Sequence, residues 1–279
     1  MAGFEHHGVA VAAVVGWPIA QSKSPRLFDH WFARHGIAGR YVPLAVRPED
    51  FAAVYDALPR AGLRGINVTV PHKEQALALA DMVMPRARAV GAANMIVFDP
   101  ERGRVADNTD GYGFMQALSA GAPDWDPGAA PALVLGAGGA ARAVVHALGE
   151  AGVPTVKLTN RTRARAEALA DLAPTVEVID WQARSAAIAE AGLIVNTTSL
   201  GMLGKEALQI DLAALRPGTV VNDLVYAPMT TPLLAGAAAR GGVVVDGLGM
   251  LLHQARPAFR AWFGVDPQVD TALRAACLA

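Results

Sequence analysis

Short apolar runs alternate with amphipathic stretches along the first third of the chain. The predicted strands cover residues 9–15, 40–46 and 65–70, and the predicted helices cover residues 25–35, 48–58 and 71–80. Residues 95–98 and 104–106 are predicted to form a hairpin around an Asp/Gly-rich turn. Because strands alternate with helices, we expect a mostly parallel sheet covered by helices.

A second α/β run follows residues 121–128, a segment rich in Pro, Gly and Asp that has the composition of a domain boundary. Beyond it, the predicted strands cover residues 132–135, 155–159, 176–179, 193–196, 220–224 and 243–246, and the predicted helices cover residues 140–150 and 162–172. Residues 250–263 carry one apolar stripe, which predicts a further helix. The predicted fold class is therefore α/β, with two α/β domains.

The composition fits a folded chain and argues against two classes of partner. Of the 279 residues, 53% are hydrophobic and 18% are charged, which allows a large core. The net charge of −1 argues against nucleic acid as a partner, and no apolar run reaches the roughly 18 residues of a membrane span. The one cysteine, Cys277, cannot form an intrachain disulfide, so a reducing, cytoplasmic setting is expected. Metal binding is not expected, because no His, Cys or carboxylate cluster has ligand spacing, and solvated or hydrogen-bonded side chains are expected for His6, His7, His72 and His253.

A polar motif follows the third predicted strand. Side chains alternate between the two faces of a strand, so Asn67 and Thr69 are predicted to share a face. Lys73 then lies near the start of the next helix, where the helix dipole disfavours a cation by about 0.3–1 kcal/mol. A facing carboxylate or an anionic ligand would compensate, and Asp110 is the candidate carboxylate. The alternative is a solvated Lys73, with Asp110 as an ordinary N-cap of a helix near residues 112–120.

A glycine-rich turn links the strand at residues 132–135 to the helix after it. Gly136, Gly138 and Ala141 form the pattern G-x-G-x-x-A. In this pattern the first glycine allows a tight turn, the second lets a pyrophosphate approach the backbone, and the alanine allows close packing of the helix. The N-terminus of the helix would bind the anion. With a strand before it and a helix after it, the pattern indicates a dinucleotide site rather than a structural turn.

The end of the next strand indicates which dinucleotide binds. NAD sites usually place Asp or Glu there to bind the ribose 2′-hydroxyl, whereas this chain has Asn160 and Arg161. Arginine pairs with a 2′-phosphate, which a carboxylate would repel. Arg165 comes four residues later, so on a helix it would lie on the side of Arg161 and reach the same phosphate. These residues predict NADP, while Arg163 is interpreted as a solvated surface residue.

A further set of polar residues suits a small, carboxylated and polyhydroxylated molecule. Ser22 and Ser24 precede a predicted helix and would bind a carboxylate, with a plain N-cap role as the alternative for Ser24. Asn94 is either a helix C-cap or a substrate ligand. The side chains predicted to bind ring hydroxyls are those of Asn67, Thr69, Asn94 and Asp110.

Taken together, these motifs closely resemble those of shikimate dehydrogenases, over nearly the whole chain. The resemblance rests on residues 22–25, 67–73, 91–94, 107–111, 136–141, 160–162, 196–202, 223–226 and 249–254. It implies NADPH-dependent, reversible reduction of 3-dehydroshikimate to shikimate, a step of chorismate and aromatic amino acid biosynthesis. It also implies a substrate-binding and catalytic domain over residues 1–110, a Rossmann-type NADP domain over residues 111–246, and C-terminal helices, residues 247–279, that pack back on the substrate domain.

The resemblance assigns functional residues position by position. Lys73 and Asp110 would be the catalytic pair. The substrate would be bound by Ser22, Ser24, Asn67, Thr69, Asn94, Tyr226 and Gln254. NADP would be bound by Gly136, Gly138, Gly139, Ala140, Ala141, Asn160, Arg161, Thr162, Arg165, Thr198, Leu224 and Gly247. The oligomeric state stays open, with a homodimer as one alternative.

The chain departs from the commonest family pattern at a few positions, and these leave alternatives open. The departures are Gln21, Phe28, Asp29 and Met95, where His, His-Asn and Thr are frequent. One alternative is a quinate/shikimate dehydrogenase paralogue that uses NAD, and Arg161 and Arg165 disfavour it. The other is a non-catalytic NADPH-binding sensor, which the presence of both Lys73 and Asp110 disfavours.

Overall fold

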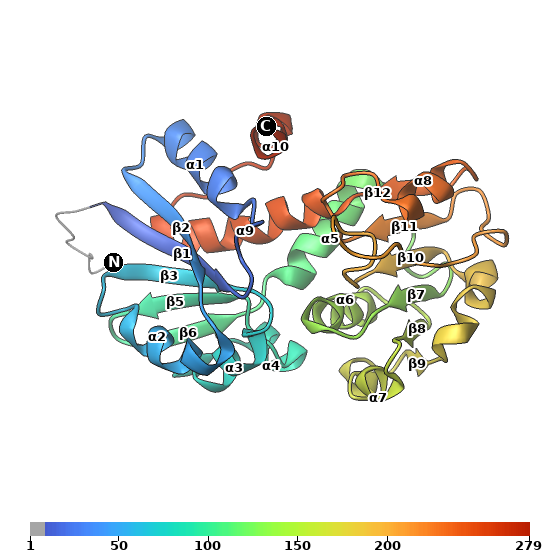
Figure 1. Ribbon diagram of the computed structural model, residues 1–279, viewed down its shortest axis with the longest axis horizontal. Helices are drawn as coiled ribbons and strands as arrows, with labels where there is room; N and C mark the ends of the chain where they lie inside the picture. The colour runs from blue at the N-terminus through green and yellow to red at the C-terminus, as the bar shows by residue number, and fades with distance from the viewer. Residues whose placement is uncertain (1–8) are drawn as a thin grey trace. The chain divides into compact units, whose positions relative to one another are not determined.

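The computed structural model describes residues 9–279, which form two compact units (Figure 1). The first unit contains the described residues up to Thr109 together with Gln254–Ala279, and the second contains Asp110–His253. Over these residues, each unit is built on one six-stranded sheet. The chain therefore leaves the first unit after Thr109 and returns to it at Gln254.

The sheet of the first unit has the strand order β2-β1-β3-β5-β6-β4. Its strands are β1 (Ala10–Gly16), β2 (Gly39–Ala45), β3 (Leu63–Val68), β4 (Met82–Val83), β5 (Met95–Asp99) and β6 (Gly103–Asp107). β1 pairs in parallel with β2 and β3, and β4 pairs in parallel with β6, whereas β5 pairs antiparallel with β3 and β6. The predicted mostly parallel sheet and the predicted hairpin are confirmed. The carboxyl ends of β1, β2 and β3 meet at one edge of this sheet.

Helices and one close backbone approach complete the first unit. Its helices are α1 (Ser24–His35), α2 (Phe51–Ala57), α3 (Lys73–Ala78), α4 (Pro85–Val90), the end of α9 (Gly247–Phe263) and α10 (Thr271–Leu278). The apolar residues of α1, among them the fully buried Trp31, recur at helical spacing, and Gly36 (φ 63°) ends the helix. Trp262 of α9 crosses β3 at Gly65, where a Cβ would lie 2.0 Å from the indole Nε1. The indole donates to the carbonyl of Ile96 (3.1 Å), so α9 is fastened across the sheet.

The sheet of the second unit is parallel throughout and has the order β12-β11-β10-β7-β8-β9. Its strands are β7 (Ala132–Leu135), β8 (Val156–Thr159), β9 (Val176–Val178), β10 (Leu193–Asn196), β11 (Val220–Asp223) and β12 (Val243–Val245). From β7, the sheet continues on one side through β8 to β9 and on the other side through β10 and β11 to β12. This is the doubly wound Rossmann order, and ligands of such sheets bind at the carboxyl ends of the strands where the order reverses, here between β7 and β10.

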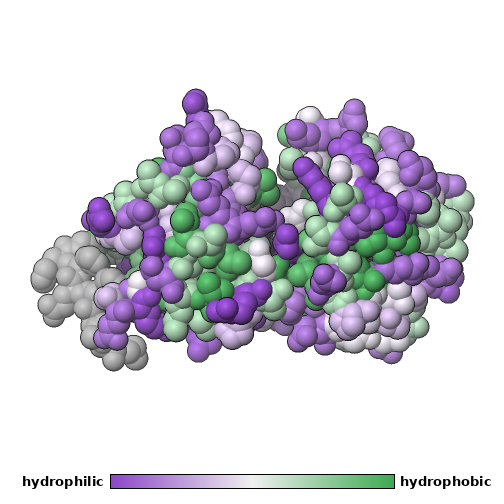
Figure 2. All heavy atoms as spheres, turned by 90° about the horizontal axis from the view of Figure 1, so that it is seen from below, coloured by the Kyte–Doolittle hydropathy of each residue, from purple (hydrophilic) through white to green (hydrophobic). Residues whose placement is uncertain are grey.

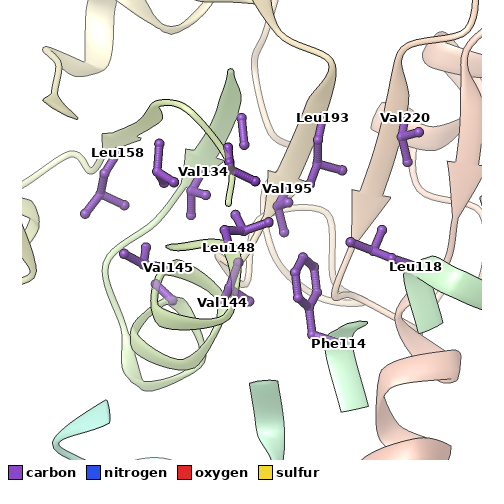
Figure 3. Close-up of a cluster of buried hydrophobic side chains, with 14 of the residues drawn as sticks. Phe114, Leu118, Val134, Val144, Val145, Leu148, Leu158, Leu193, Val195 and Val220 are labelled. Carbon is purple, nitrogen blue, oxygen red and sulfur yellow. The ribbon is translucent and has the colours of Figure 1, made fainter. Parts of the chain in front are cut away.

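Apolar side chains from two helices form the core on one face of this sheet (Figure 3). The helices of the second unit are α5 (Asp110–Gly121), α6 (Gly139–Glu150), α7 (Arg163–Glu167), α8 (Pro232–Ala238) and the start of α9. Phe114 of α5 and Val144 and Leu148 of α6 are fully buried against strand residues such as Val134 and Val195. Burial of each large apolar side chain contributes about 1.5–3 kcal/mol, so this cluster holds α6 firmly behind the turn that precedes it.

The boundaries of several elements differ from those predicted. The helix predicted over residues 71–80 begins at Lys73, because His72 N–H closes a turn onto the carbonyl of Thr69 (3.0 Å). The helix predicted over residues 162–172 ends at Glu167, after which Leu169 N–H turns back to Ala166 (2.9 Å). Three short elements, β4, α4 and α8, were not predicted, and α10 lies within the C-terminal helices that the resemblance implied over residues 247–279. Short 3-10 helices cover Pro48–Asp50, Ala170–Leu172, Trp181–Arg184 and Ala186–Glu190.

The surface shown in Figure 2 is mixed in character. Hydrophilic residues cover much of it, and apolar residues reach the surface in patches between them. None of the helices in residues 9–279 combines the length and the apolar character that a bilayer crossing requires.

Candidate functional site

The turn that carries Lys73 is built by hydrogen bonds at the carboxyl end of β3. Thr69 N–H donates to Val15 of β1 (2.9 Å), and His72 N–H donates to Thr69 (3.0 Å), so the chain turns directly into α3. Lys73 is the first residue of α3 and is partly buried. The lysine is therefore held at a helix start at the edge where β1 and β3 end, as the sequence predicted.

His72 anchors this turn from inside the unit. Its side chain is 1% exposed, its Nε2 lies 2.8 Å from the carbonyl of Val46, and its ring stacks on Phe51 at 4.4 Å. Burial lowers the pKa of His72, so the neutral ring that fits this site is favoured. His72 is thus a hydrogen-bonded core histidine, while His6 and His7 lie outside the described residues. Within those residues, no group of three or more His, Cys, Asp or Glu side chains could hold a metal ion.

The amide of Asn67 is oriented by two partners. Its Oδ1 accepts a hydrogen bond from the hydroxyl of Tyr41 (2.7 Å), and its Nδ2 donates to the carbonyl of Asn94 (3.1 Å). A carbonyl can only accept, so Nδ2 must face Asn94 and Tyr41 must donate to Oδ1. One N–H of the partly buried Asn67 is left to bind a ligand. Tyr41 is a residue of the site that sequence reasoning missed.

A second amide pair lies where the chain enters and leaves the first unit. Asn94 is 2% exposed, and its Nδ2 donates to Thr109 Oγ1 (3.0 Å) and to Gln254 Oε1 (2.8 Å). Its Oδ1 accepts from Thr109 N–H (2.8 Å), and the Thr109 hydroxyl lies 2.9 Å from the carbonyl of Gln254. Because Gln254 Oε1 accepts from Asn94, the Nε2 group of Gln254 is left as a hydrogen-bond donor. Asn94 is not a helix C-cap, because α4 ends at Gly91 in the left-handed conformation (φ 70°).

Asp110 follows Thr109 directly and is 2% exposed. It is the first residue of α5 rather than an N-cap outside the helix, so its carboxylate lies in the first turn, where the helix dipole favours an anion. Thr109, bound by Asn94, fixes the backbone from which Asp110 projects. Lys73 and Asp110 are thus each the first residue of a helix, and the predicted pairing of their side chains remains a prediction.

The two serines lie at the start of α1. Ser24 is the first residue of the helix, and its N–H donates to the hydroxyl of Ser22 (3.3 Å). The interpretation of Ser24 as the N-cap is wrong, since Lys23 occupies that position. Lys23 Nζ donates to the carbonyl of Cys277 (2.8 Å), so α10 fixes the turn between the serines. Both hydroxyls remain available as donors to a carboxylate.

The glycine-rich turn between β7 and α6 fits a pyrophosphate. Gly136 has φ 108°, and a Cβ there would lie 2.6 Å from Thr197 Oγ1, so only glycine fits this position. Gly138 is exposed at the N-cap of α6, with open space where a Cβ would be and no side chain capping the helix. Ala141 is fully buried against the sheet. The first backbone N–H groups of α6, at Gly139 and beyond, can therefore bind an anion.

The basic segment after β8 separates into paired and unpaired arginines. Asn160 Nδ2 donates to the carbonyl of Thr162 (2.9 Å) and closes the turn. Arg163 is bound to Glu167 (2.8 Å) and to Asp180 (2.5 Å). Arg161 and Arg165 are exposed, and neither forms a salt bridge within residues 9–279.

The argument that placed Arg161 and Arg165 on one helix face is wrong. α7 begins at Arg163 with Thr162 as its N-cap, so Arg161 precedes the helix. Arg165 N–H donates to the carbonyl of Thr162 (3.0 Å), which makes residues 162–165 a single tight turn. Arg161 directly precedes this turn and Arg165 is its last residue, and both charges are available to an anion.

The remaining residues assigned to NADP are Thr198, Leu224 and Gly247, which follow β10, β11 and β12. The Thr198 hydroxyl is 2.7 Å from Asn196 Oδ1, and Leu224 N–H donates to the carbonyl of Asn196 (3.0 Å). At Gly247 a Cβ would lie 2.2 Å from the carbonyl oxygen of Leu224, so glycine is required for α9 to start against β11. Tyr226, two residues beyond Leu224, is partly buried, and burial raises its pKa.

Family models match three parts of the chain. The shikimate dehydrogenase substrate-binding domain matches residues 14–96, the shikimate/quinate 5-dehydrogenase domain matches residues 126–212, and the shikimate 5'-dehydrogenase C-terminal domain matches residues 247–277. These matches lie in both units, so the resemblance is not confined to a nucleotide-binding fold.

Relatives and solved structures agree with these models. The shikimate dehydrogenase (NADP(+)) of Dinoroseobacter shibae is 56% identical over 97% of this chain and 98% of its own length. Shikimate 5-dehydrogenase of Thermus thermophilus, solved with NADP(H) and shikimate, is 37% identical with a TM-score of 0.86 and covers 96% of this chain and 98% of its own. Quinate dehydrogenase of Corynebacterium glutamicum, in complex with NAD, is 30% identical with a TM-score of 0.90 and covers 97% of this chain and 99% of its own. The chain belongs to the shikimate dehydrogenase family.

Proposed function

We propose that the protein is an NADP-dependent shikimate dehydrogenase that reversibly reduces 3-dehydroshikimate to shikimate, in the cytoplasm, as a step of chorismate biosynthesis. The observation that carries the proposal is the set of oriented amides in the first unit, at Asn67, Asn94 and Gln254. These contacts leave N–H groups of Asn67 Nδ2 and Gln254 Nε2 to donate to a ring with several hydroxyl groups, while Asn94 orients Gln254. The name and 56% identity of the Dinoroseobacter shibae relative support the same substrate.

The protein binds the substrate at two kinds of group, the carboxylate and the ring hydroxyls. Ser22 and Ser24, at the start of α1, bind its carboxylate, and Tyr226 is proposed as a further partner of that group. The ring hydroxyls are bound by Asn67, Thr69, Asn94, Asp110 and Gln254. Both hydrogens of Asn94 Nδ2 are committed to Thr109 and Gln254, so Asn94 acts on the substrate by orienting Gln254 or by exchanging one of these bonds.

Lys73 moves the proton in this proposal. When bound, NADPH would supply the hydride for the carbonyl carbon. Lys73 Nζ donates a proton to the carbonyl oxygen as that oxygen becomes a hydroxyl. In the reverse direction the same amine accepts that proton. Asp110 orients the ammonium group by a charge-assisted hydrogen bond. The turn from Thr69 to Lys73, fixed by backbone hydrogen bonds, limits the positions that the ammonium can take.

The residues of the second unit fit NADP better than NAD. Gly136, Gly138 and the start of α6 receive the pyrophosphate, while Asn160 with Thr162 borders the ribose. Arg161 and Arg165 carry unbalanced positive charge where an NAD enzyme usually presents a carboxylate. The Corynebacterium glutamicum quinate dehydrogenase, solved with NAD, keeps NAD use and quinate as the second candidate function.

An initial-rate assay tests the proposal. The protein is given shikimate or quinate, each with NADP or NAD, and kcat/KM is compared over the four combinations. We expect shikimate with NADP to exceed each of the others by at least tenfold. A preference for quinate, or for NAD, would support the paralogue instead. No turnover with any pair, together with measurable NADPH binding, would support a non-catalytic sensor.

A further inference from the structure

A buried carboxylate at the end of β11 has no role in the function described so far. Asp223 is completely buried, and its Oδ1 accepts hydrogen bonds from Asn196 Nδ2 (2.9 Å) and Val225 N–H (3.0 Å). Its Oδ2 accepts from the hydroxyl of Thr231 (2.7 Å). A carboxylate in this setting is costly to bury unless it is well satisfied, so its retention calls for a specific reason.

The hydrogen bonds of Asp223 extend into the loop after the neighbouring strand. Asn196 ends β10, and its Oδ1 accepts from both the N–H (3.0 Å) and the hydroxyl (2.7 Å) of Thr198. Asn196 Nδ2 also donates to the carbonyl of Leu200 (3.1 Å), and Leu200 N–H donates to Thr198 Oγ1 (3.1 Å). Residues 197–200 are thus tied to Asp223 through one amide. This loop also packs against the glycine-rich turn, where a Cβ on Gly136 would lie 2.8 Å from Thr198 Cγ2.

Asp223 binds the segment after its own strand as well. Thr231 is the N-cap of α8, and its Oγ1 accepts from Leu234 N–H (3.3 Å) while it donates to Asp223. Val225 N–H binds the other carboxylate oxygen, so residues 224–231 are held at both ends. This segment contains Leu224 and Tyr226. A single carboxylate therefore joins two loops that leave adjacent strands at the carboxyl edge of the sheet.

The donor set fits an ionised Asp223. Oδ1 already receives two donors, and Thr231 Oγ1 receives the N–H of Leu234, so the threonine has its proton to give to Oδ2. Burial raises the pKa of Asp223, and the hydrogen bonds from Thr231, Val225 and Asn196 act in the opposite direction. With the negative charge present, every polar atom named here is paired.

We propose that Asp223 is a positioning residue for NADP(H): its buried carboxylate fixes the loops of residues 197–200 and 224–231 in the arrangement that receives the cofactor. The proposal rests on the proposed function, since it concerns the same cofactor. Thr198 and Leu224 are both assigned to the cofactor, and both form hydrogen bonds with Asn196, whose Nδ2 donates to this carboxylate. Asp223 acts through them.

The test measures NADPH binding rather than turnover alone. Asp223→Asn keeps the shape and removes the charge, and Thr231→Val removes the donor to Oδ2 together with the cap of α8. Thr231→Ser keeps the hydroxyl and should restore binding. Asn222→Leu is the matched control, because Asn222 is also buried (1% exposed) and also on β11, but its Nδ2 donates only to Val245 (2.9 Å), away from both loops.

We expect the Kd for NADPH, followed by its fluorescence, to rise about tenfold in Asp223→Asn and Thr231→Val. In Thr231→Ser and Asn222→Leu it should stay within threefold of wild type, although Asn222→Leu lowers the melting temperature. The Kd for shikimate alone, from calorimetry, should rise less than the Kd for NADPH in Asp223→Asn and Thr231→Val, because Tyr226 is the one proposed substrate ligand in the segment of residues 224–231.

The result that overturns the proposal is an unchanged Kd for NADPH in both Asp223→Asn and Thr231→Val, or a rise in Asn222→Leu as large as theirs. If Asp223→Asn does not fold, the comparison of Thr231→Val with Thr231→Ser decides alone. A wild-type protein that binds no NADPH would refute the proposed function itself, which is a different outcome from wild-type binding that the variants leave unaltered.

Discussion

The choice of cofactor rests on two arginines whose charge the protein does not neutralise. Arg161 and Arg165 are exposed and have no salt-bridge partner in the described part of the chain, whereas Arg163 between them is bound by Glu167 and Asp180. A 2′-phosphate is the chemical difference between NADP and NAD. We therefore predict that Arg161→Ala raises KM for NADP at least tenfold and leaves KM for NAD nearly unchanged.

The magnitude follows from the kind of contact and its exposure. A hydrogen bond to a charged group contributes about 1.5–3 kcal/mol, and exposure to water favours the lower half of that range. A loss of about 2 kcal/mol corresponds to roughly thirtyfold in affinity. In the double variant Arg161→Ala/Arg165→Ala, the KM for NADP should approach the KM for NAD. High salt should weaken the wild-type preference as well, because exposed ion pairs are screened.

Arg163→Ala is the control for this experiment. It removes the same charge from the same turn, but from a side chain already occupied by Glu167 and Asp180. We expect KM for NADP to change less than threefold in this variant. The assay is shikimate oxidation at saturating shikimate, with NADP or NAD varied. Equal losses in Arg161→Ala and Arg163→Ala would show that only the general positive potential matters, and equal losses for NADP and NAD would refute the phosphate assignment.

Other predictions concern the first unit. Lys73→Ala should lower kcat by about 10²–10⁴-fold, which is the usual contribution of a general acid, while the Kd values for shikimate and NADPH stay within a few-fold of wild type. An unchanged kcat would rule out Lys73 as the acid/base. Ser22→Ala should raise KM for shikimate about tenfold or more without changing KM for NADP, since a hydrogen bond to a carboxylate contributes about 1.5–3 kcal/mol. Tyr41→Phe removes one of the two hydrogen bonds that orient the amide of Asn67, so KM for shikimate should rise several-fold at nearly constant kcat; an equal fall in kcat would instead show that Tyr41 affects the chemical step. Burial lowers the pKa of His72, so this imidazole binds a proton more readily in the unfolded chain than in the folded one. The free energy of unfolding should therefore fall as the pH drops below about 6.5, and it should fall less steeply in His72→Gln. Urea denaturation at several pH values measures both slopes.

Features set by neighbouring residues were predictable from the sequence, and the glycine-rich turn is the clearest case. A strand, a glycine that must take a positive φ and a helix follow one another directly, so the residues of this short segment alone predict the shape of the turn. The alternation of strands and helices likewise predicted both sheets. Element ends were less predictable, because single hydrogen bonds such as His72 N–H to Thr69 decide them.

Contacts between distant parts of the chain were not predictable from pattern alone. Tyr41 lies 26 positions from Asn67, and no spacing rule connects a tyrosine in one strand to an asparagine in another. A helix C-cap was one of the two alternatives for Asn94, and no local pattern predicted its bond to Gln254, which is 160 positions away. The arginine argument failed for a related reason: helical spacing holds only inside a helix, and α7 starts two residues after Arg161.

The positions at which the chain departs from the common family pattern can now be weighed by what they contact. Gln21 and Asp29 are exposed, and Gln21 Nε2 reaches only the carbonyl of Pro18 (3.3 Å). Phe28 is fully buried and stacks on Tyr41 at 3.8 Å, nearly parallel. It therefore packs against the ring whose hydroxyl donates to Asn67. If the Phe28 departure shifts the preference from shikimate towards quinate, we expect it to act through the contacts from Phe28 to Tyr41 and from Tyr41 to the Asn67 amide, so Phe28→His should change the ratio of kcat/KM for the two substrates, and an unchanged ratio would refute this route.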